Sequence, residues 1–187
     1  MFNVGVIMFE LSDHQLNCLN SITAKIFEFP WRVMWNHRYN DLYEFNPPKG
    51  DGLLCTGDVH WPWIEANCTP QEISVLTDDL ALDPATCRLV RQGIERTLAP
   101  HIDDYGNRMY SILINYRHPL CLNHIVKGVQ TQTIIPEGGY SWLDNSLLHD
   151  AGPVDQTVQN LNLSINWGAN QYLEDVAVKL GISLDSV

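Results

Sequence analysis

Three residues stand at a spacing that suits a mononuclear metal site. His101 and Asp103 form an HxD pattern, and His149 follows 48 residues after His101. Two imidazole nitrogens and one carboxylate oxygen make the facial triad of non-haem Fe(II) enzymes, which leaves open positions for a cosubstrate and for O2. Residues two apart in a strand point to the same side. We therefore predict His101, Asp103 and His149 as metal ligands and catalytic residues.

Each member of this triad also has a simpler interpretation. His101 follows Pro100 and lies close to a run of loop residues, which suits a solvated turn. His149 could be a structural histidine that bonds to Asp150 or Asp144. The remaining histidines need no role as core or loop residues, and they are His14, His37, His60, His118 and His124. In a cupin-like metalloenzyme with a different cosubstrate, His118 or His124 would join the ligands.

The elements around the triad indicate a strand-rich second half. Strand-like segments are expected at 87–98, 108–116, 124–135 around Gly128, 140–143 and 157–167. In the first half, apolar spacing predicts a helix over 11–28, and Thr69-Pro70-Gln71-Glu72 resembles a helix start. Residues 55–70 before it are expected to be an irregular loop, and a last helix is expected over 170–180.

This order predicts a mainly β fold with flanking helices (α+β), namely a double-stranded β-helix or jelly roll. Such a fold brings an HxD pair and a distant histidine to one open end. We expect a single domain over 1–187. Its parts are a helical and irregular flank (1–85), the β-helix core (86–167) and a C-terminal helix or tail (168–187).

At these residues the chain resembles the aspartyl/asparaginyl β-hydroxylase branch of the Fe(II)/2-oxoglutarate oxygenases. The resemblance covers 86–167. It rests on RLVRQGIERTLAPHID, on Asn107-Arg108 at the start of the next strand, and on WLDNSLLH, which ends at His149. It implies a hydroxylase that uses Fe(II), 2-oxoglutarate and O2, with an amino-acid-like small molecule or a peptide side chain as substrate. The first 85 residues resemble no family that we can name.

One departure from the family concerns the cosubstrate. The family usually has an arginine about ten residues after the distal histidine, to hold the far carboxylate of 2-oxoglutarate. Here that strand carries Asn160 and Asn162 and has no basic residue. Another cation could reach in, neutral amides could bind the cosubstrate, or the cosubstrate is not 2-oxoglutarate. The candidate cations are Arg108 first, then Arg117 and Lys127.

Charge and cysteine content limit the binding partners and the cellular compartment that we expect for this protein. The chain has 22 acidic and 11 basic side chains, for a formal net charge of −11. Nucleic acids and anionic membrane surfaces are therefore not expected as partners, because both bind clustered Lys and Arg. Five cysteines without a CxxC pair indicate reduced thiols in a cytoplasmic protein. The main non-enzymatic alternative is a β-sandwich binding module or assembly protein, such as a viral one. The sequence leaves the oligomeric state open.

Overall fold

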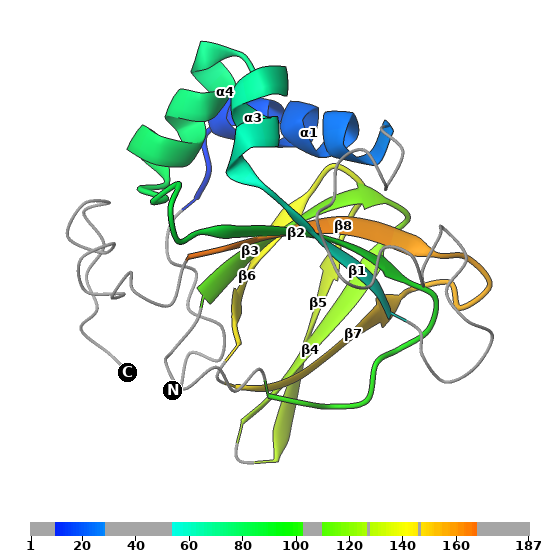
Figure 1. Ribbon diagram of the computed structural model, residues 1–187. Helices are drawn as coiled ribbons and strands as arrows, with labels where there is room; N and C mark the ends of the chain where they lie inside the picture. The colour runs from blue at the N-terminus through cyan, green and yellow to red at the C-terminus, as the bar shows by residue number, and fades with distance from the viewer. Residues whose placement is uncertain (1–9, 29–53, 103–109, 127, 146, 168–187) are drawn as a thin grey trace.

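The structure, a computed structural model, describes residues 10–28, 54–102, 110–126, 128–145 and 147–167. Strands in these ranges form two antiparallel sheets, with helices over one of them (Figure 1). The strands are β1 (Leu54–Val59), β2 (Arg88–Ile94), β3 (Tyr110–Arg117), β4 (Leu120–Val126), β5 (Val129–Ile135), β6 (Tyr140–Asp144), β7 (Leu148–Pro153) and β8 (Asn160–Asn166). The helical elements are α1 (Asp13–Glu28), α3 (Trp61–Asn67), α4 (Pro70–Ser74) and a π-helical turn, η1 (Val75–Asp79).

The chain alternates between the two sheets. The larger sheet has the order β1-β2-β8-β3-β6, and the smaller has the order β5-β4-β7. After β3 the chain crosses for β4 and β5, returns for β6, crosses again for β7 and ends in β8. His101, between β2 and β3, also reaches the smaller sheet, because it forms an antiparallel bridge with His149 of β7. This topology confirms the predicted double-stranded β-helix with flanking helices.

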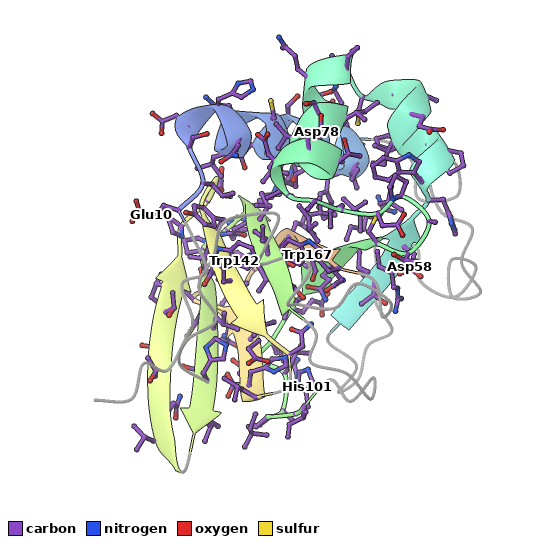
Figure 2. All side chains as sticks on the ribbon, turned by 90° about the vertical axis from the view of Figure 1, so that its left-hand side faces the viewer. Glu10, Asp58, Asp78, His101, Trp142 and Trp167 are labelled. Carbon is purple, nitrogen blue, oxygen red and sulfur yellow. The ribbon has the colours of Figure 1, made fainter. Side chains whose placement is uncertain are left out.

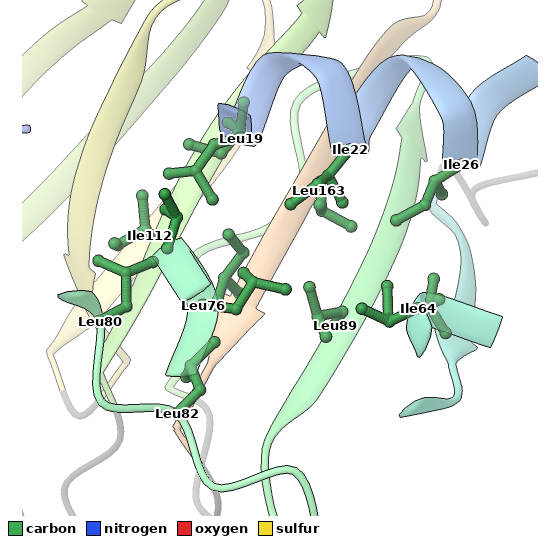
Figure 3. Packing of buried hydrophobic residues seen from close by; sticks show 14 of the residues in the cluster. Leu19, Ile22, Ile26, Ile64, Leu76, Leu80, Leu82, Leu89, Ile112 and Leu163 are labelled. Carbon is green, nitrogen blue, oxygen red and sulfur yellow. The ribbon is translucent and has the colours of Figure 1, made fainter. Parts of the chain in front are cut away.

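The helices cover one face of the larger sheet (Figure 3). Alternate side chains of β3 and β8, such as Ile112 and Leu163, point to this face and are fully buried. Leu19, Ile22 and Ile26 pack on them from one side of α1, at the spacing of an amphipathic helix. Side chains from α3, from η1 and from the residues just after η1 complete this cluster, namely Ile64, Leu76, Leu80 and Leu82.

The opposite face of the larger sheet looks toward the smaller sheet. An apolar cluster lies there, made of Ile94, Leu113, Leu120, Leu122, Ile135, Leu143 and Ala151. The inward positions of β8 are polar, although they are buried, and they are Asn160, Asn162, Ser164 and Asn166. The interior between the sheets is therefore divided into an apolar part and a row of neutral polar side chains.

Glu72 fastens α4 to α1. Thr69 and Glu72 form a reciprocal capping box, which confirms the predicted helix start. The Glu72 carboxylate also accepts from Ser21 Oγ at 2.6 Å and from Lys25 Nζ at 2.6 and 2.8 Å. Burial alone would raise the pKa of Glu72, but the Lys25, Ser21 and Thr69 hydrogen bonds outweigh it and lower the pKa to about 2.

The predicted irregular loop over 55–70 was wrong. This segment holds most of β1 and all of α3. β1 pairs with β2 along its whole length, so a partner distant in sequence makes the strand. α3 has its proline, Pro62, in the first turn, where its missing N–H costs no helical hydrogen bond.

The expected strands at 87–98, 108–116, 140–143 and 157–167 correspond to β2, β3, β6 and β8, but 124–135 is not a single strand, and β7 lies where no strand was expected. The segment around Gly128 is the β4–β5 hairpin, in which Gly128 has a φ of 78°. The predicted helix over 170–180 lies outside the described residues. Four described cysteines are free thiols, namely Cys18, Cys68, Cys87 and Cys121. Within the described ranges, no helix has both the length and the apolar character needed to cross a bilayer.

Candidate metal centre

His101 and His149 lie side by side in the smaller sheet. Their backbones form a reciprocal pair, in which each N–H donates to the other residue's carbonyl oxygen at 2.9 Å. The ring centroids are 4.5 Å apart, with the planes inclined by 53°. His101 lies at the end of the sheets away from the helices (Figure 2). The fold therefore brings together two of the three predicted ligands.

A backbone carbonyl holds each of these two rings in the same way. His101 Nδ1 lies 2.8 Å from the Ala99 carbonyl oxygen, and His149 Nδ1 lies 2.8 Å from that of Leu147. Because a carbonyl only accepts, Nδ1 carries the proton in both rings. The neutral imidazole then has its lone pair on Nε2. This arrangement is typical of metal-binding histidines, since the Nδ1–H bond fixes both tautomer and ring orientation.

The third predicted ligand, Asp103, lies outside the described residues. Among the residues that the structure describes, no three His, Cys, Asp or Glu side chains are grouped closely enough to hold a metal ion. The complete triad therefore stays a prediction.

A third histidine, His124, lies beside the pair. It is opposite His149 in the β4–β7 register, and the two ring centroids are 6.4 Å apart. Its side chain is only 4% exposed, and its Nε2 has no hydrogen-bond partner among the residues that the structure describes. Burial, followed by nearby His149, lowers the pKa of His124 against the opposing effect of Asp144. The sequence signal for its position was its parity with Leu120 and Leu122, which face the interior.

The other spare histidine of interest, His118, lies elsewhere. It has a φ of 62° at the β3–β4 turn, and its N–H donates to Glu137 Oε2 at 3.1 Å. That turn is at the opposite end of β4 from His124. The structure therefore separates the two histidines that the cupin-like interpretation left as alternatives.

A hydroxyl and amide cluster lies at the end where β6 passes into β7. Asn145 Nδ2 donates to Ser111 Oγ at 2.8 Å, and Ser111 Oγ donates to Asn166 Oδ1. Ser164 Oγ donates to the same oxygen at 3.1 Å. Asn145 is 2% exposed, and its Oδ1 has no partner. This end of the sandwich also carries His149, the second residue of β7.

Three asparagines form a chain of hydrogen bonds deeper in the interior. Asn115 Nδ2 donates to the carbonyl oxygens of His118 and Ile135, at 2.8 and 3.0 Å. Asn160 Nδ2 donates to Asn115 Oδ1 at 2.7 Å, and Asn162 Nδ2 donates to Asn160 Oδ1 at 2.8 Å. Asn160, a predicted cosubstrate contact, thus has its amide engaged within the fold. Asn162, the other one, is fully buried, and its Oδ1 has no partner.

The predicted cations do not gather at the histidines within the described residues. Arg117 is exposed at the end of β3, with its guanidinium carbon 5.5 Å from the centre of the Tyr116 ring. Arg108 and Lys127 lie outside the described residues. Of the basic residues that the structure describes, Arg91 donates to the Ile26 carbonyl oxygen of α1, Lys25 bonds to Glu72, and Arg96 and Arg117 are exposed. Arg88 lies opposite Asn166 in the β2–β8 register and forms a partly exposed ion pair with Asp58 at 2.9 Å.

No family model and no curated protein matches the sequence. Several solved structures are similar in fold. Hydroxypropylphosphonic acid epoxidase from S. wedmorenis matches with a TM-score of 0.39 and 9% identity, over 62% of this chain and 51% of that chain. An oxalate oxidase matches with a TM-score of 0.43 and 13% identity, over 67% of this chain and 55% of that chain. Peruvianin-I, a cysteine peptidase from Thevetia peruviana latex, matches with a TM-score of 0.45 and 13% identity, over 67% of this chain and 69% of that chain.

The match spans about half the length of the epoxidase. At these scores and identities the likeness assigns no residue and no activity to this chain. The strand order defines a jelly roll, and the arrangement of its histidines is compatible with a metalloenzyme.

Proposed function

We propose that the protein is a non-haem Fe(II) oxygenase whose metal is held by His101, His149 and Asp103. The observation that carries the proposal is the pair of adjacent imidazoles, each with Nδ1–H fixed by a backbone carbonyl. Two such rings provide neutral nitrogen donors of the kind that Fe(II) accepts, and Asp103 would add the carboxylate. These residues fit a divalent metal because both imidazoles present a lone pair on Nε2, with the tautomer fixed by the backbone carbonyls.

The protein residues supply geometry and water exclusion. The carbonyls of Ala99 and Leu147 orient the rings before any metal is bound, so little ordering is needed on binding. His149 is buried and His101 is partly exposed, so solvent reaches the pair at His101. Bound iron would supply the activation of O2 for oxidation of a carbon centre.

Dependence on 2-oxoglutarate is a finer form of this proposal, and so is an amino-acid-like or peptide substrate. Both rest on the family resemblance of 86–167. The far carboxylate would need a cation, and Arg108 and Lys127 are the remaining predicted candidates, since Arg117 is exposed over Tyr116. Formation of succinate from 2-oxoglutarate by the Fe(II)-loaded protein is the direct assay for this form.

Calorimetric titration with Fe(II) under anaerobic conditions tests the metal site. We expect His101→Ala and His149→Ala each to weaken the affinity by more than about tenfold. His14→Ala, which changes an exposed histidine on α1, is the matched control and should leave it unchanged. An unchanged affinity in His101→Ala would refute the proposed site.

A second candidate is a cupin-like metalloenzyme with a different cosubstrate. The observation that favours it is the position of His124, whose buried Nε2 has no partner and whose ring lies 6.4 Å from that of His149. If His124 is a ligand, His124→Leu lowers the Fe(II) affinity in the same titration. If the triad is His101, Asp103 and His149, the affinity stays close to that of the wild type.

A further inference from the structure

The side-chain amide of Asn162 has a fixed orientation. Asn160 Nδ2 faces the carbonyl oxygens of Arg117 and His118, at 3.1 and 2.7 Å, and carbonyls only accept. The Asn160 amide nitrogen must therefore point to them, which turns Asn160 Oδ1 toward Asn162. Asn162 donates its Nδ2 to that oxygen at 2.8 Å. Asn162 thus uses one of its two Nδ2 hydrogens in this bond, and its Oδ1, an acceptor, is the atom that has no partner among the described residues.

This acceptor is buried and unused. Asn162 is 0% exposed, and within the described ranges its Oδ1 has no hydrogen-bond partner. Leaving a buried polar atom unpaired costs free energy, and a leucine at this inward position would avoid that cost. A second buried amide oxygen, Asn145 Oδ1, is unpaired at the outer end of the same interior. Both atoms need a donor, and no residue that the structure describes provides one.

The position of Asn162 relates it to the metal centre. It lies on the inward face of β8, in register with Gln92 of β2 and Asn115 of β3. It is about 13 Å along β8 from Asn166, which lies at the histidine end. This is the strand on which the family resemblance expects the far carboxylate of the cosubstrate to be held. A carboxylate there would face another acceptor oxygen.

We propose that the inner end of the site binds a hydrogen-bond donor, such as a carboxamide, a hydroxyl or an ammonium group, and not a carboxylate. The inference rests on the proposed metal site at the outer end of the same interior. A ligand that chelates the metal would extend inward and donate to Asn162 Oδ1. 2-Oxoglutarate, with a carboxylate at its far end, would then bind less well than a neutral counterpart.

Two matched probes can separate these possibilities. N-Oxalylglycine and N-oxalylglycinamide share the same chelating end and differ at the far end, where one has a carboxylate and the other a carboxamide. Their dissociation constants are measured by calorimetry on the full chain loaded with Mn(II), which avoids oxidation chemistry. We expect the carboxamide probe to bind at least about tenfold more tightly, which is ~1.4 kcal/mol.

Substitution at Asn162 assigns that preference to its oxygen. Asn162→Leu removes the acceptor and should bring the ratio of the two dissociation constants close to one. Asn162→Thr serves the same purpose if the leucine variant does not fold, because it shortens the side chain and withdraws the amide oxygen. Gln130→Leu changes an exposed amide on β5 and should keep the wild-type ratio.

The outcomes distinguish this inference from the proposed function. If Mn(II) binds and the carboxylate probe binds as tightly as the carboxamide probe or more tightly, the inference is overturned while the metal site stands. A ratio that is unchanged in Asn162→Leu or Asn162→Thr also overturns it. If the wild type binds no metal, the proposed function fails, and the inference fails with it.

Discussion

The two central histidines owe their orientation to atoms that are not side chains. His101 and His149 bond to each other through their backbones and to Ala99 and Leu147 through Nδ1. In both cases the carbonyl lies two residues before the ring that it holds. The residue types and spacing could predict which histidines meet, because the HxD pattern and a distant histidine suit a jelly roll. The carbonyl contacts depend on local backbone geometry, which the side-chain pattern does not encode.

Asn162 and His124 show what the residue pattern could not predict. The sequence placed an amide where the family has an arginine, but the direction of that amide follows from carbonyls of a distant turn. His124 looked like one of several spare histidines. Its place opposite His149 results from the pairing of β4 with β7, whose register is a tertiary property.

His124→Leu is expected to stabilise the ligand-free protein. The wild-type ring has a buried Nε2 without a partner, and leucine has a similar volume with no polar atom. Removing an unpaired buried polar atom should raise the free energy of unfolding by about 1 kcal/mol. Urea denaturation of the metal-free wild type and variant at pH 7.5 measures this difference in the free energy of unfolding. Asn123→Leu is the contrasting variant and should destabilise, because it leaves Asp150 without its 2.6 Å hydrogen bond. A less stable His124→Leu would show that Nε2 has a partner in the folded protein.

At the scale of elements, strands with clear alternation were predictable and those made by distant pairing were not. β8 alternates buried apolar and polar residues and falls within its predicted segment, 157–167. β3 has a run of apolar residues at its centre and extends one residue beyond its predicted segment, 108–116. β1 contains Gly57 and Asp58 and has little strand character of its own. It forms because β2 offers it a complete edge. The π-helical turn after α4 likewise has no sequence signature that we recognised.

The contact between α1 and α4 predicts a loss of stability in acid. Glu72 has its pKa lowered from 4.5 to about 2, because the Lys25, Ser21 and Thr69 hydrogen bonds outweigh burial. A carboxylate with a lowered pKa contributes stability above its unfolded pKa, and this contribution is lost as the pH falls toward the folded pKa. Glu72→Gln should therefore lower the free energy of unfolding by on the order of 2 kcal/mol at pH 7. This value is smaller than the full pKa shift would give, because the Lys25 side chain is 30% exposed and solvent screens the pair.

Urea denaturation of wild type and Glu72→Gln between pH 7 and pH 2.5 measures this contribution. The difference between them should be constant down to about pH 4.5 and then shrink as the pH approaches 2. Glu65→Gln alters an exposed carboxylate on α3 and is the control, with a change within about 0.5 kcal/mol. A difference that does not depend on pH would mean that the charge of Glu72 contributes nothing.

For the whole molecule, the larger sheet is buried on both faces. The smaller sheet covers one face, and α1, α3, α4 and η1 cover the other. Trp167 joins the larger sheet to the helical layer, because its ring stacks on Trp142 with the centroids 5.2 Å apart and its Nε1 donates to the Leu80 carbonyl oxygen at 2.9 Å. The first 85 residues, which resemble no family that we can name, thus provide one of the three layers. The family-like segment 86–167 does not contain its own complete core.

The fragment 86–187 is therefore expected not to fold cooperatively by itself. Without the helices it would expose the outward apolar face of its large sheet, which comprises Leu89, Ile112, Ile114, Trp142, Leu161, Leu163 and Ile165. Burial of each such side chain contributes about 1.5–3 kcal/mol, so losing several exceeds the usual net stability of a domain. Urea denaturation followed by tryptophan fluorescence should give one sharp transition for the full chain and a broad, gradual change for the fragment. The fragment should also bind a hydrophobic dye, because its apolar face is exposed. Mixing in the fragment 1–85 should restore part of the transition. A sharp transition in 86–187 alone would show that the helices are an independent addition to a complete β-helix.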